Sequence, residues 1–143
     1  MVKIRPITAD DFPNWLPLWD GNNNGQRDQE ITTETWARLT DPAFPVHGIV
    51  AEKNGELVGL VQYVLHYTTG HIEPICYMQD VYVPPEQRQQ GIARKMVEHL
   101  AKVGKEQKWP RMYWLAESDN EAAQKLYKTL GVKLDFTLHV LVP

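Results

Sequence analysis

One stretch of the sequence, from Ile75 to Val103, most constrains the fold, because it joins a predicted buried strand to a predicted helix through a turn with a single glycine. The apolar run from Ile75 to Val83 ends at two prolines, which indicates one strand of a sheet. The helix that follows has apolar residues at helical spacing on one face: Ile92, Met96, Val97, Leu100 and Val103. A second strand is predicted from Met112 to Ala116. Strand, helix and strand in this order predict a right-handed crossover and a parallel strand pair.

The sequence before this stretch predicts a strand, two helices and a hairpin. A strand over Val2–Arg5 precedes a helix capped by Thr8, which Pro17 is expected to kink or end early. A second helix is predicted from Thr33 to Thr40, and the asparagine- and glycine-rich stretch between the helices is expected to be a loop. The apolar runs on either side of Asn54-Gly55 predict a hairpin, since both residues tolerate the positive φ of a type I′ turn.

The last part of the chain predicts another helix and a final strand. Ser118 and Glu121 have the spacing of a capping box, and Gly131 is expected to take the left-handed conformation that ends the helix. Alternating apolar and polar residues from Val132 to Val142 predict a strand that closes the sheet. No linker or repeat interrupts the pattern, so residues 1–143 are expected to form a single domain.

Composition argues against several functional classes. The chain has 143 residues, a formal net charge of -3 and a pI of about 5.9, with lysine and arginine spread along it, so we expect no nucleic-acid partner. No run approaches the length of a membrane span and the start has no apolar targeting region, so we expect a cytoplasmic protein with no membrane partner. The histidines show no paired metal spacing and Cys76 is the only cysteine, so no metal is expected.

The turn before the Ile92 helix has the chemistry of an anion-binding site. Backbone N–H groups at a helix N-terminus are unpaired and carry the positive end of the helix dipole, so they bind a pyrophosphate without side-chain charge. Gly91 allows the backbone to approach, Ala93 keeps the first helical turn open, and Arg88 adds a cation or orders the loop. The spacing matches neither a Walker A loop nor the glycine triplet of dinucleotide-binding folds, which argues against a nucleoside triphosphate or NAD.

Two motifs in this order resemble the GNAT superfamily of N-acetyltransferases: Arg88-x-x-Gly91-x-Ala93 after a strand, and Tyr127-x-x-x-Gly131 at the end of a helix. The resemblance extends over nearly the whole chain. It implies an α/β (α+β) fold with a mixed, mostly antiparallel sheet, in which a central parallel strand pair splays apart between flanking helices. The segments 39–42, 80–83 and 113–120 look like the branch of histone and polyamine acetyltransferases.

The resemblance also implies roles for individual residues, with acetyl-CoA as the cosubstrate. The main-chain amides of one segment are expected to hold the CoA pyrophosphate: Gln89, Gln90, Gly91, Ile92, Ala93 and Arg94. The strand segment Val81, Tyr82 and Val83 is expected to contact the acetyl group and pantetheine, which lies between the splayed strands. Asn120 matches the position that hydrogen-bonds pantetheine, and Tyr127 matches the tyrosine that protonates the departing thiolate.

Direct transfer within a ternary complex requires a neutral amine, whereas a lysine-like ammonium has a pKa of about 10.4, so a base or a water chain must remove a proton. Asp80 and Glu117 are the candidate bases, because they lie at or near the C-terminal ends of the predicted parallel strands. Ordered water or another carboxylate, such as Glu73, is the alternative. Side chains alternate along a strand, so Asp80 and Tyr82 are expected to share one face while Val81 points to the other.

The acceptor is expected to be a primary amine, on a small molecule or on a protein lysine. The segments 21–30 and 67–73 and the C-terminal strand are the expected acceptor-binding parts. On this side, the acidic residues Asp20, Asp28, Glu30 and Glu73 either bind a cation or form a solvated surface. Two other functions stay open at this point, an aminoglycoside-type acetyltransferase and a non-catalytic acetyl-CoA-binding sensor. The resemblance also implies a homodimer or higher homo-oligomer.

Overall fold

A computed structural model describes residues 1–143 and places five strands in one sheet, in the order β1-β2-β3-β4-β5. The strands are β1 (Lys3–Pro6), β2 (Val46–Lys53), β3 (Glu56–His66), β4 (Ile75–Tyr82) and β5 (Met112–Tyr113). The helices are α1 (Phe12–Asn22), α2 (Gln29–Leu39), α3 (Ile92–Gln107) and α4 (Glu121–Leu130), with short 3-10 turns η1 (Ala9–Asp11) and η2 (Pro85–Gln87).

The sheet has the predicted mixed topology. Strands β1 to β4 pair antiparallel, and β4 pairs parallel with β5, so the predicted α/β (α+β) class and its parallel pair are confirmed. The hairpin between β2 and β3 turns at Asn54 and Gly55, whose φ angles are 52° and 80°. Both residues therefore have the positive φ that the type I′ prediction requires.

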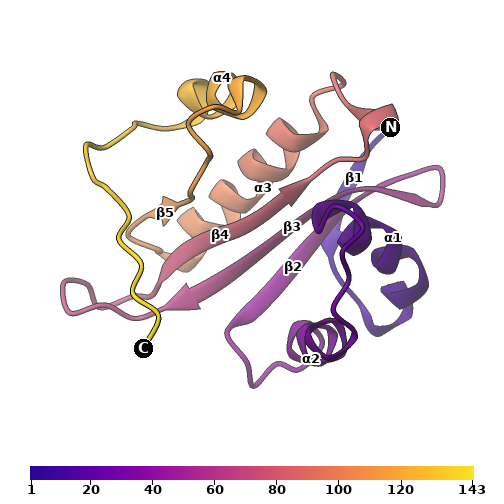
Figure 1. Cartoon of the computed structure of the whole chain (residues 1–143), viewed down its shortest axis with the longest axis horizontal. Coiled ribbons are helices and arrows are strands. Elements are labelled where there is room, and N and C mark those ends of the chain that lie inside the picture. Colours follow the sequence, from indigo (N-terminus) through magenta and orange to yellow (C-terminus); the bar gives the residue numbers. More distant parts are fainter.

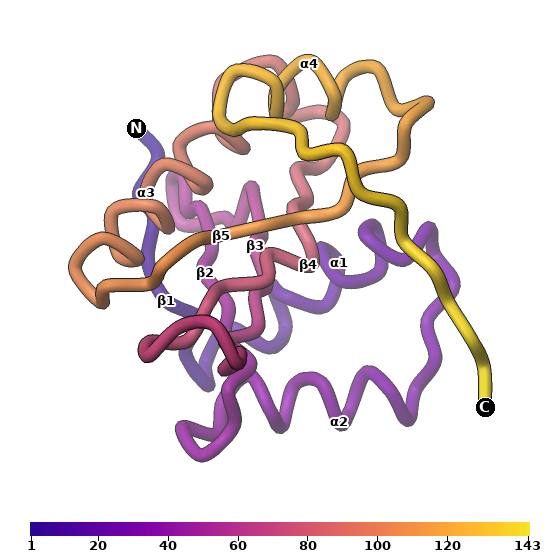
Figure 2. Tube along the Cα trace, turned by 90° about the vertical axis from the view of Figure 1, so that its left-hand side faces the viewer, coloured from indigo at the N-terminus to yellow at the C-terminus, as the bar shows by residue number.

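Helices cover both faces of the sheet. Figure 2 shows α1 and α2 on one face and α3 on the other, while α4 lies beyond the β4 and β5 end of the sheet (Figure 1). The larger core cluster packs α3 against the sheet, and a second cluster packs Trp15, Leu18 and Trp19 of α1 against Val50 and Leu60. Cys76 is fully buried in the larger cluster, and burial raises the pKa of its thiol to about 12.

The first two helices differ from the predicted ones. Pro17 does not end α1, which continues to Asn22, because the burial of Trp15 and Trp19 outweighs the one backbone hydrogen bond that proline cannot donate. Helix α2 begins at Gln29 rather than Thr33. The side chain of Asp28 accepts a hydrogen bond from the Ile31 N–H at 3.0 Å and so caps the helix earlier.

The predicted C-terminal helix is present as α4, but its cap, the conformation of Gly131 and the final strand were predicted wrongly. Asn120, not Ser118, caps α4, since its Oδ1 accepts a hydrogen bond from the Ala123 N–H at 3.1 Å. Gly131 has an extended backbone with φ -149°, and a side chain there would meet the Trp114 ring at 3.0 Å, so close packing accounts for this glycine. Strand β5 ends at Tyr113, and residues 132–142 form no strand.

Candidate active site

The turn between β4 and α3 has an unusual backbone. Gln89 and Gly91 have positive φ angles of 64° and 75°, and nothing lies within 4 Å of the position where a Gly91 side chain would begin. Glycine is therefore favoured at position 91 by backbone conformation and not by lack of space. The Arg88 Nε donates a hydrogen bond to the Val83 carbonyl at 2.8 Å, so of the two predicted roles of Arg88, the structure shows the ordering of the loop.

The N-terminus of α3 is open to a cavity. No side chain caps this end, and the first helical hydrogen bond runs from the Lys95 N–H to the Gly91 carbonyl, so the preceding N–H groups are available to a ligand. A cavity of about 270 Å³ lies there, bounded by the turn and by Ala122 and Leu126 of α4. Its other lining residues are Val83, Gln87, Arg88, Gln89, Gly91, Ile92, Ala93 and Arg94.

Several residues of the turn hold neighbouring elements together. The Arg94 guanidinium donates a hydrogen bond to the Thr129 hydroxyl at 2.5 Å, which joins α3 to α4 across the cavity. The Gln90 side chain accepts one from the Lys53 Nζ at 3.2 Å. Ile92 is only 2% exposed, so its side chain belongs to the core and only its main chain faces a ligand.

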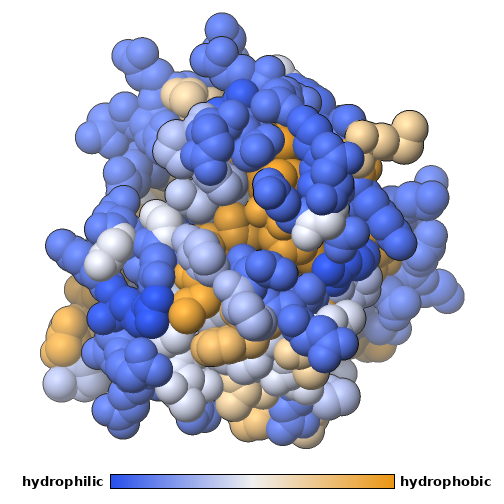
Figure 3. Space-filling view, turned by 90° about the vertical axis from the view of Figure 1, so that its right-hand side faces the viewer, coloured by the Kyte–Doolittle hydropathy of each residue, from blue (hydrophilic) through white to orange (hydrophobic).

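Strands β4 and β5 part soon after they meet. Only Cys76 with Met112 and Tyr77 with Tyr113 are paired, and from Trp114 the chain leads away to α4. The predicted splayed pair is thus present, and β4 continues alone on this side from Met78 to Tyr82. On the side of the molecule toward which β4 runs, apolar surface lies in a hollow ringed by hydrophilic side chains (Figure 3).

A β-bulge in β4 decides which way Asp80 points. Gln62 pairs with Asp80 and Tyr63 pairs with Met78, so Gln79 is the additional residue on β4. Asp80 and Tyr82 then face α1, whereas Val81 and Val83 pack in the core on the α3 side. The predicted separation of these side chains onto two faces is confirmed.

Two amide side chains fix the Asp80 carboxylate. The Gln62 Nε2 donates to Oδ2 at 2.7 Å and the Asn22 Nδ2 donates to Oδ1 at 3.0 Å. The buried Trp15 Nε1–H donates to the Gln62 Oε1 at 2.9 Å, which forces the Gln62 amide to present its NH₂ group to Asp80. This chain of hydrogen bonds places an oriented negative charge on the α1 face of β4. Gln62, a polar residue in the middle of an apolar run of β3, is the signal in the sequence that the prediction did not use.

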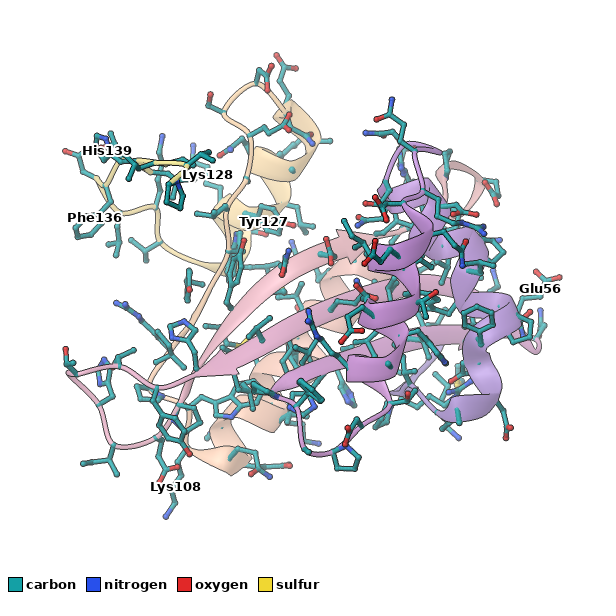
Figure 4. All side chains as sticks on the ribbon, turned by 60° about the horizontal axis from the view of Figure 1, so that its bottom comes forward. Glu56, Lys108, Tyr127, Lys128, Phe136 and His139 are labelled. Atoms are coloured by element: carbon teal, nitrogen blue, oxygen red, sulfur yellow. The ribbon has the colours of Figure 1, made fainter.

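Tyr127 approaches from the opposite side. Its side chain projects from α4 toward the sheet and packs on Trp114, with the ring centroids 5.2 Å apart (Figure 4). The side chain is half-buried, and this burial raises its pKa above the ordinary value of 10.0. The phenol is therefore protonated throughout the neutral range, as a proton donor must be.

The remaining predicted acids are less well placed. Glu117 and Glu73 are exposed, and the side chain of neither makes a hydrogen bond or an ion pair. Asp20 is bound by Arg27, whose Nε donates to it at 2.7 Å, and Asp28 caps α2. Among the candidate bases, only Asp80 has its carboxylate oriented by neighbouring side chains.

An aromatic cluster that sequence reasoning missed lies where β4 and β5 part. Tyr77 stacks on Tyr113 with centroids 5.0 Å apart, and the Tyr113 hydroxyl lies 2.9 Å from the His66 Nε2. The three side chains come from three neighbouring strands. No sequence motif marks them, because their proximity arises only from the strand register. No group of three or more His, Cys, Asp or Glu side chains is arranged to hold a metal ion, and no helix is both long and apolar enough to cross a membrane.

A splayed parallel pair, an uncapped helix N-terminus after a positive-φ glycine, and a tyrosine on the following helix together define a GNAT-type acetyltransferase fold. The model of the acetyltransferase (GNAT) family matches residues 3–132, so the chain belongs to this family. It is an acetyltransferase by family, and the expectation from its sequence motifs is confirmed.

Two curated relatives have named reactions. D-amino-acid N-acetyltransferase HPA3 of Saccharomyces cerevisiae is 31% identical over 143 residues, which cover 96% of this chain and 89% of that protein. Thialysine N-epsilon-acetyltransferase of Sus scrofa is 40% identical over 78 residues, which cover 54% of this chain and 45% of that protein.

Solved structures share the fold at lower sequence identity. Ribosomal-protein-alanine N-acetyltransferase of Brucella melitensis superposes with a TM-score of 0.82 at 21% identity, over 99% of both chains. The aminoglycoside acetyltransferase AAC(6')-Iy, in complex with a CoA bisubstrate analogue, gives 0.84 at 17% identity, over 100% of this chain and 98% of that one. At these identities the match supports the fold alone.

Proposed function

We propose that this chain, acting as one domain, transfers the acetyl group of acetyl-CoA to the primary amine of a small molecule, with an amino acid as the first acceptor to test. The observation that carries the proposal is the cavity of about 270 Å³ between the uncapped end of α3 and α4. The full-length similarity to a D-amino-acid N-acetyltransferase supports the acceptor class.

The residues around the cavity fit the pyrophosphate of CoA. Free N–H groups at the start of a helix that extends from Ile92 to Gln107 offer hydrogen bonds and a positive dipole end to an anion. Positive φ at Gln89 and Gly91 turns the main chain around the same point. Pantetheine then lies along the unpaired side of β4, near the main chain of Val81 and Val83, with Asn120 at the α4 end.

The reaction is a direct transfer in a ternary complex. The amine nitrogen attacks the acetyl carbonyl carbon, the new C–N bond forms, and the C–S bond breaks. The hydroxyl of Tyr127 gives its proton to the departing sulfur and regains one from solvent, while the proton lost by the amine passes to Asp80 or to water next to it. The main-chain N–H of Val81 stabilises the oxyanion that forms during the attack.

Asp80 gives the acceptor side its preference for an amine. The carboxylate is fixed by Gln62 and Asn22, so it attracts an ammonium group without first reorganising. A substrate ammonium meets this charge on the α1 face of β4.

Thiol release from acetyl-CoA over a panel of amines tests the proposal. The panel contains D- and L-amino acids, thialysine, a lysine-containing peptide, a polyamine and an aminoglycoside. We expect release above the rate of spontaneous hydrolysis with at least one amino acid, and mass spectrometry of the N-acetyl product confirms transfer. Preference for the peptide or the aminoglycoside would overturn the acceptor class, and acetyl-CoA binding without release on any amine would overturn the enzyme in favour of a sensor.

A further inference from the structure

The aromatic cluster of His66, Tyr77 and Tyr113 lies outside both core clusters. The rings of Tyr77 and Tyr113 are nearly parallel, with 18° between their planes, and the His66 ring stands at 87° to that of Tyr113. Both tyrosines are half-buried, and neither packs against a core cluster. Rings that stack on one another without filling a core form a surface suited to a flat ligand.

The aromatic cluster lies on the same face of the sheet as Asp80. The two neighbours of Tyr77 on β4 pack in the core on the α3 side, so Tyr77 points to the opposite face. Tyr113 points the same way, because Met112 before it packs in that core. The β3 partners of Tyr77 and Asp80 are two positions apart, so the bulge in β4 brings Asp80 back to the face of Tyr77.

Tyr77 and Asp80 are consecutive side chains on this face. Same-face neighbours in an antiparallel strand lie about 7 Å apart, which is twice the rise per residue. Neither α1 nor α2 extends over the paired ends of β4 and β5 (Figure 1), so a ligand can reach the rings. An oriented negative charge and an open pair of rings are therefore neighbours on one surface.

His66 holds Tyr113 in place. The His66 Nδ1 lies 3.3 Å from the Tyr67 carbonyl, which can only accept a hydrogen bond, so we assign the imidazole proton to Nδ1. The Nε2 then accepts a hydrogen bond from the Tyr113 hydroxyl at 2.9 Å. Tyr113 is thus held at its hydroxyl by His66 and at its ring by Tyr77, and a ligand meets rings that are already ordered.

We propose that the acceptor is an amino acid with an aromatic side chain, whose ammonium group meets Asp80 while its ring stacks on the aromatic cluster. This assignment rests on the proposed acetyl transfer and leaves its chemistry unchanged: the nitrogen gains the acetyl group and the CoA thiol leaves. Two carbon atoms separate the nitrogen of such an amino acid from its ring, and stacked ring centroids lie about 5 Å apart, so one molecule can span Asp80 and Tyr77.

A series of acceptors, measured by thiol release with the unmodified protein, tests the proposal. The series is alanine, cyclohexylalanine and phenylalanine, each as both enantiomers, so the charged groups stay constant and only the side chain changes. Within the preferred enantiomer, we expect kcat/KM for phenylalanine to exceed that for alanine roughly tenfold, because the ring is buried. It should exceed that for cyclohexylalanine about threefold, because a saturated ring buries similar area but does not stack.

Two variants at one position show whether the rings cause this preference. Tyr113→Phe keeps the ring and loses only the hydrogen bond to His66, so it should keep most of the preference for phenylalanine over alanine. Tyr113→Leu removes the ring and should lower the ratio of the two kcat/KM values about threefold or more. Because both acceptors are measured on the same protein, this ratio does not depend on how much of a variant folds.

Equal kcat/KM for alanine and phenylalanine would overturn this inference and leave the proposed function standing. A phenylalanine value no higher than that for cyclohexylalanine, or a ratio that Tyr113→Leu leaves unchanged, would overturn it as well, because the rings would then not stack on the acceptor. A higher value for 1,3-diaminopropane than for phenylalanine would mean that the rings attract a second cation. Absence of transfer to any amine would instead overturn the proposed function, and this inference with it.

Discussion

At the scale of single residues, Asp80 and Tyr127 differ in how they are held, and that difference sets their proposed roles. Asp80 accepts hydrogen bonds from two amide side chains, which hold its carboxylate in one orientation. The carboxylate is therefore placed to accept a proton or to bind a cation. Tyr127 has its ring packed on Trp114 and makes no side-chain hydrogen bond, so its hydroxyl is free to act on a ligand. One residue is oriented by polar partners and the other by packing.

Removing the Tyr127 hydroxyl should slow transfer without weakening cofactor binding. In Tyr127→Phe the ring still packs on Trp114, but no proton reaches the sulfur, so kcat should fall roughly 10²-fold. The acetyl-CoA Kd from calorimetry should change by less than about twofold. Because burial raises the pKa of Tyr127, we expect the unmodified enzyme to lose the tyrosine proton only above pH 10. A kcat in Tyr127→Phe equal to that of the unmodified protein would remove Tyr127 from the mechanism.

Matched amide substitutions decide between the two candidate bases. Asp80→Asn removes a charge that Gln62 and Asn22 orient, and it should lower kcat/KM for the amine roughly 10²-fold. Glu117→Gln removes a charge on an exposed side chain without partners and should change kcat/KM by less than about twofold. The opposite ranking, measured by thiol release with the same amine, would reassign the base to Glu117.

At the scale of elements, the proposed function of the turn before α3 depends on its backbone conformation. Gly91→Ala places a side chain in open space but at φ 75°, which costs about 1–2 kcal/mol for an L-residue. The turn should relax this strain by moving, and the acetyl-CoA Kd should rise roughly tenfold. Gly55→Ala is the control, because it imposes the same kind of strain at φ 80° in the distant β2–β3 hairpin. Similar stability losses with an unchanged Kd in both variants would separate the turn from cofactor binding.

The ion-paired Asp11 ties β1 to the first turn of the helical layer. The Arg5 guanidinium donates to both of its carboxylate oxygens, at 2.8 and 2.9 Å, and this bonding lowers the pKa of Asp11 below its ordinary value of 3.8. The ionised carboxylate therefore stabilises the fold above that value, and its contribution is lost as the pH falls through the lower folded pKa.

Asp11→Asn should accordingly lower the free energy of unfolding by about 1–3 kcal/mol at pH 7, measured by urea titration. The difference from the unmodified protein should shrink as the pH falls below about 4, where the unfolded carboxyl binds a proton first, and should vanish below the lower pKa of the folded state. Asp10→Asn, an exposed neighbour without a partner, should show no difference at either pH. A gap that stays constant with pH would mean that packing, not charge, is the source of the stability.

Elements with strong local signals were predictable from the sequence. Asn54-Gly55 defined the hairpin, and the apolar spacing from Ile92 defined α3, because both signals depend on neighbouring residues alone. Pro17 led to the prediction that α1 ends early, and the helix instead continues because the burial of two tryptophans outweighs a single missing backbone hydrogen bond. Asn120 and Ser118 both have cap chemistry, and only the path of the chain into α4 decides between them.

The parts of the candidate site that belong to a sequence motif could be predicted. The parts that depend on how the strands pair could not. The turn at Gly91 and the tyrosine on α4 follow from their motifs. Asp80 was a candidate from its place on β4, but its orienting partners Gln62 and Asn22 come from another strand and a helix end. Their meeting depends on the β4 bulge, which no local pattern in the sequence marks.

At the scale of the whole molecule, the sites proposed for CoA and for the amine lie on different sides of the sheet. The N-terminus of α3 and residues of α4 line the cavity proposed for CoA. The charge proposed to attract the amine is the Asp80 carboxylate, on the face of β4 that lies toward α1 (Figure 2). The parting of β4 and β5 connects these two sides.

The most direct test of this account is a calorimetric titration of the protein with acetyl-CoA. We expect one site per chain with a Kd in the micromolar range, and competition by free CoA, because the α3 turn is proposed to bind the pyrophosphate common to both ligands. Absence of measurable binding at millimolar acetyl-CoA would contradict the central claim that the turn at Gly91 is a cofactor site.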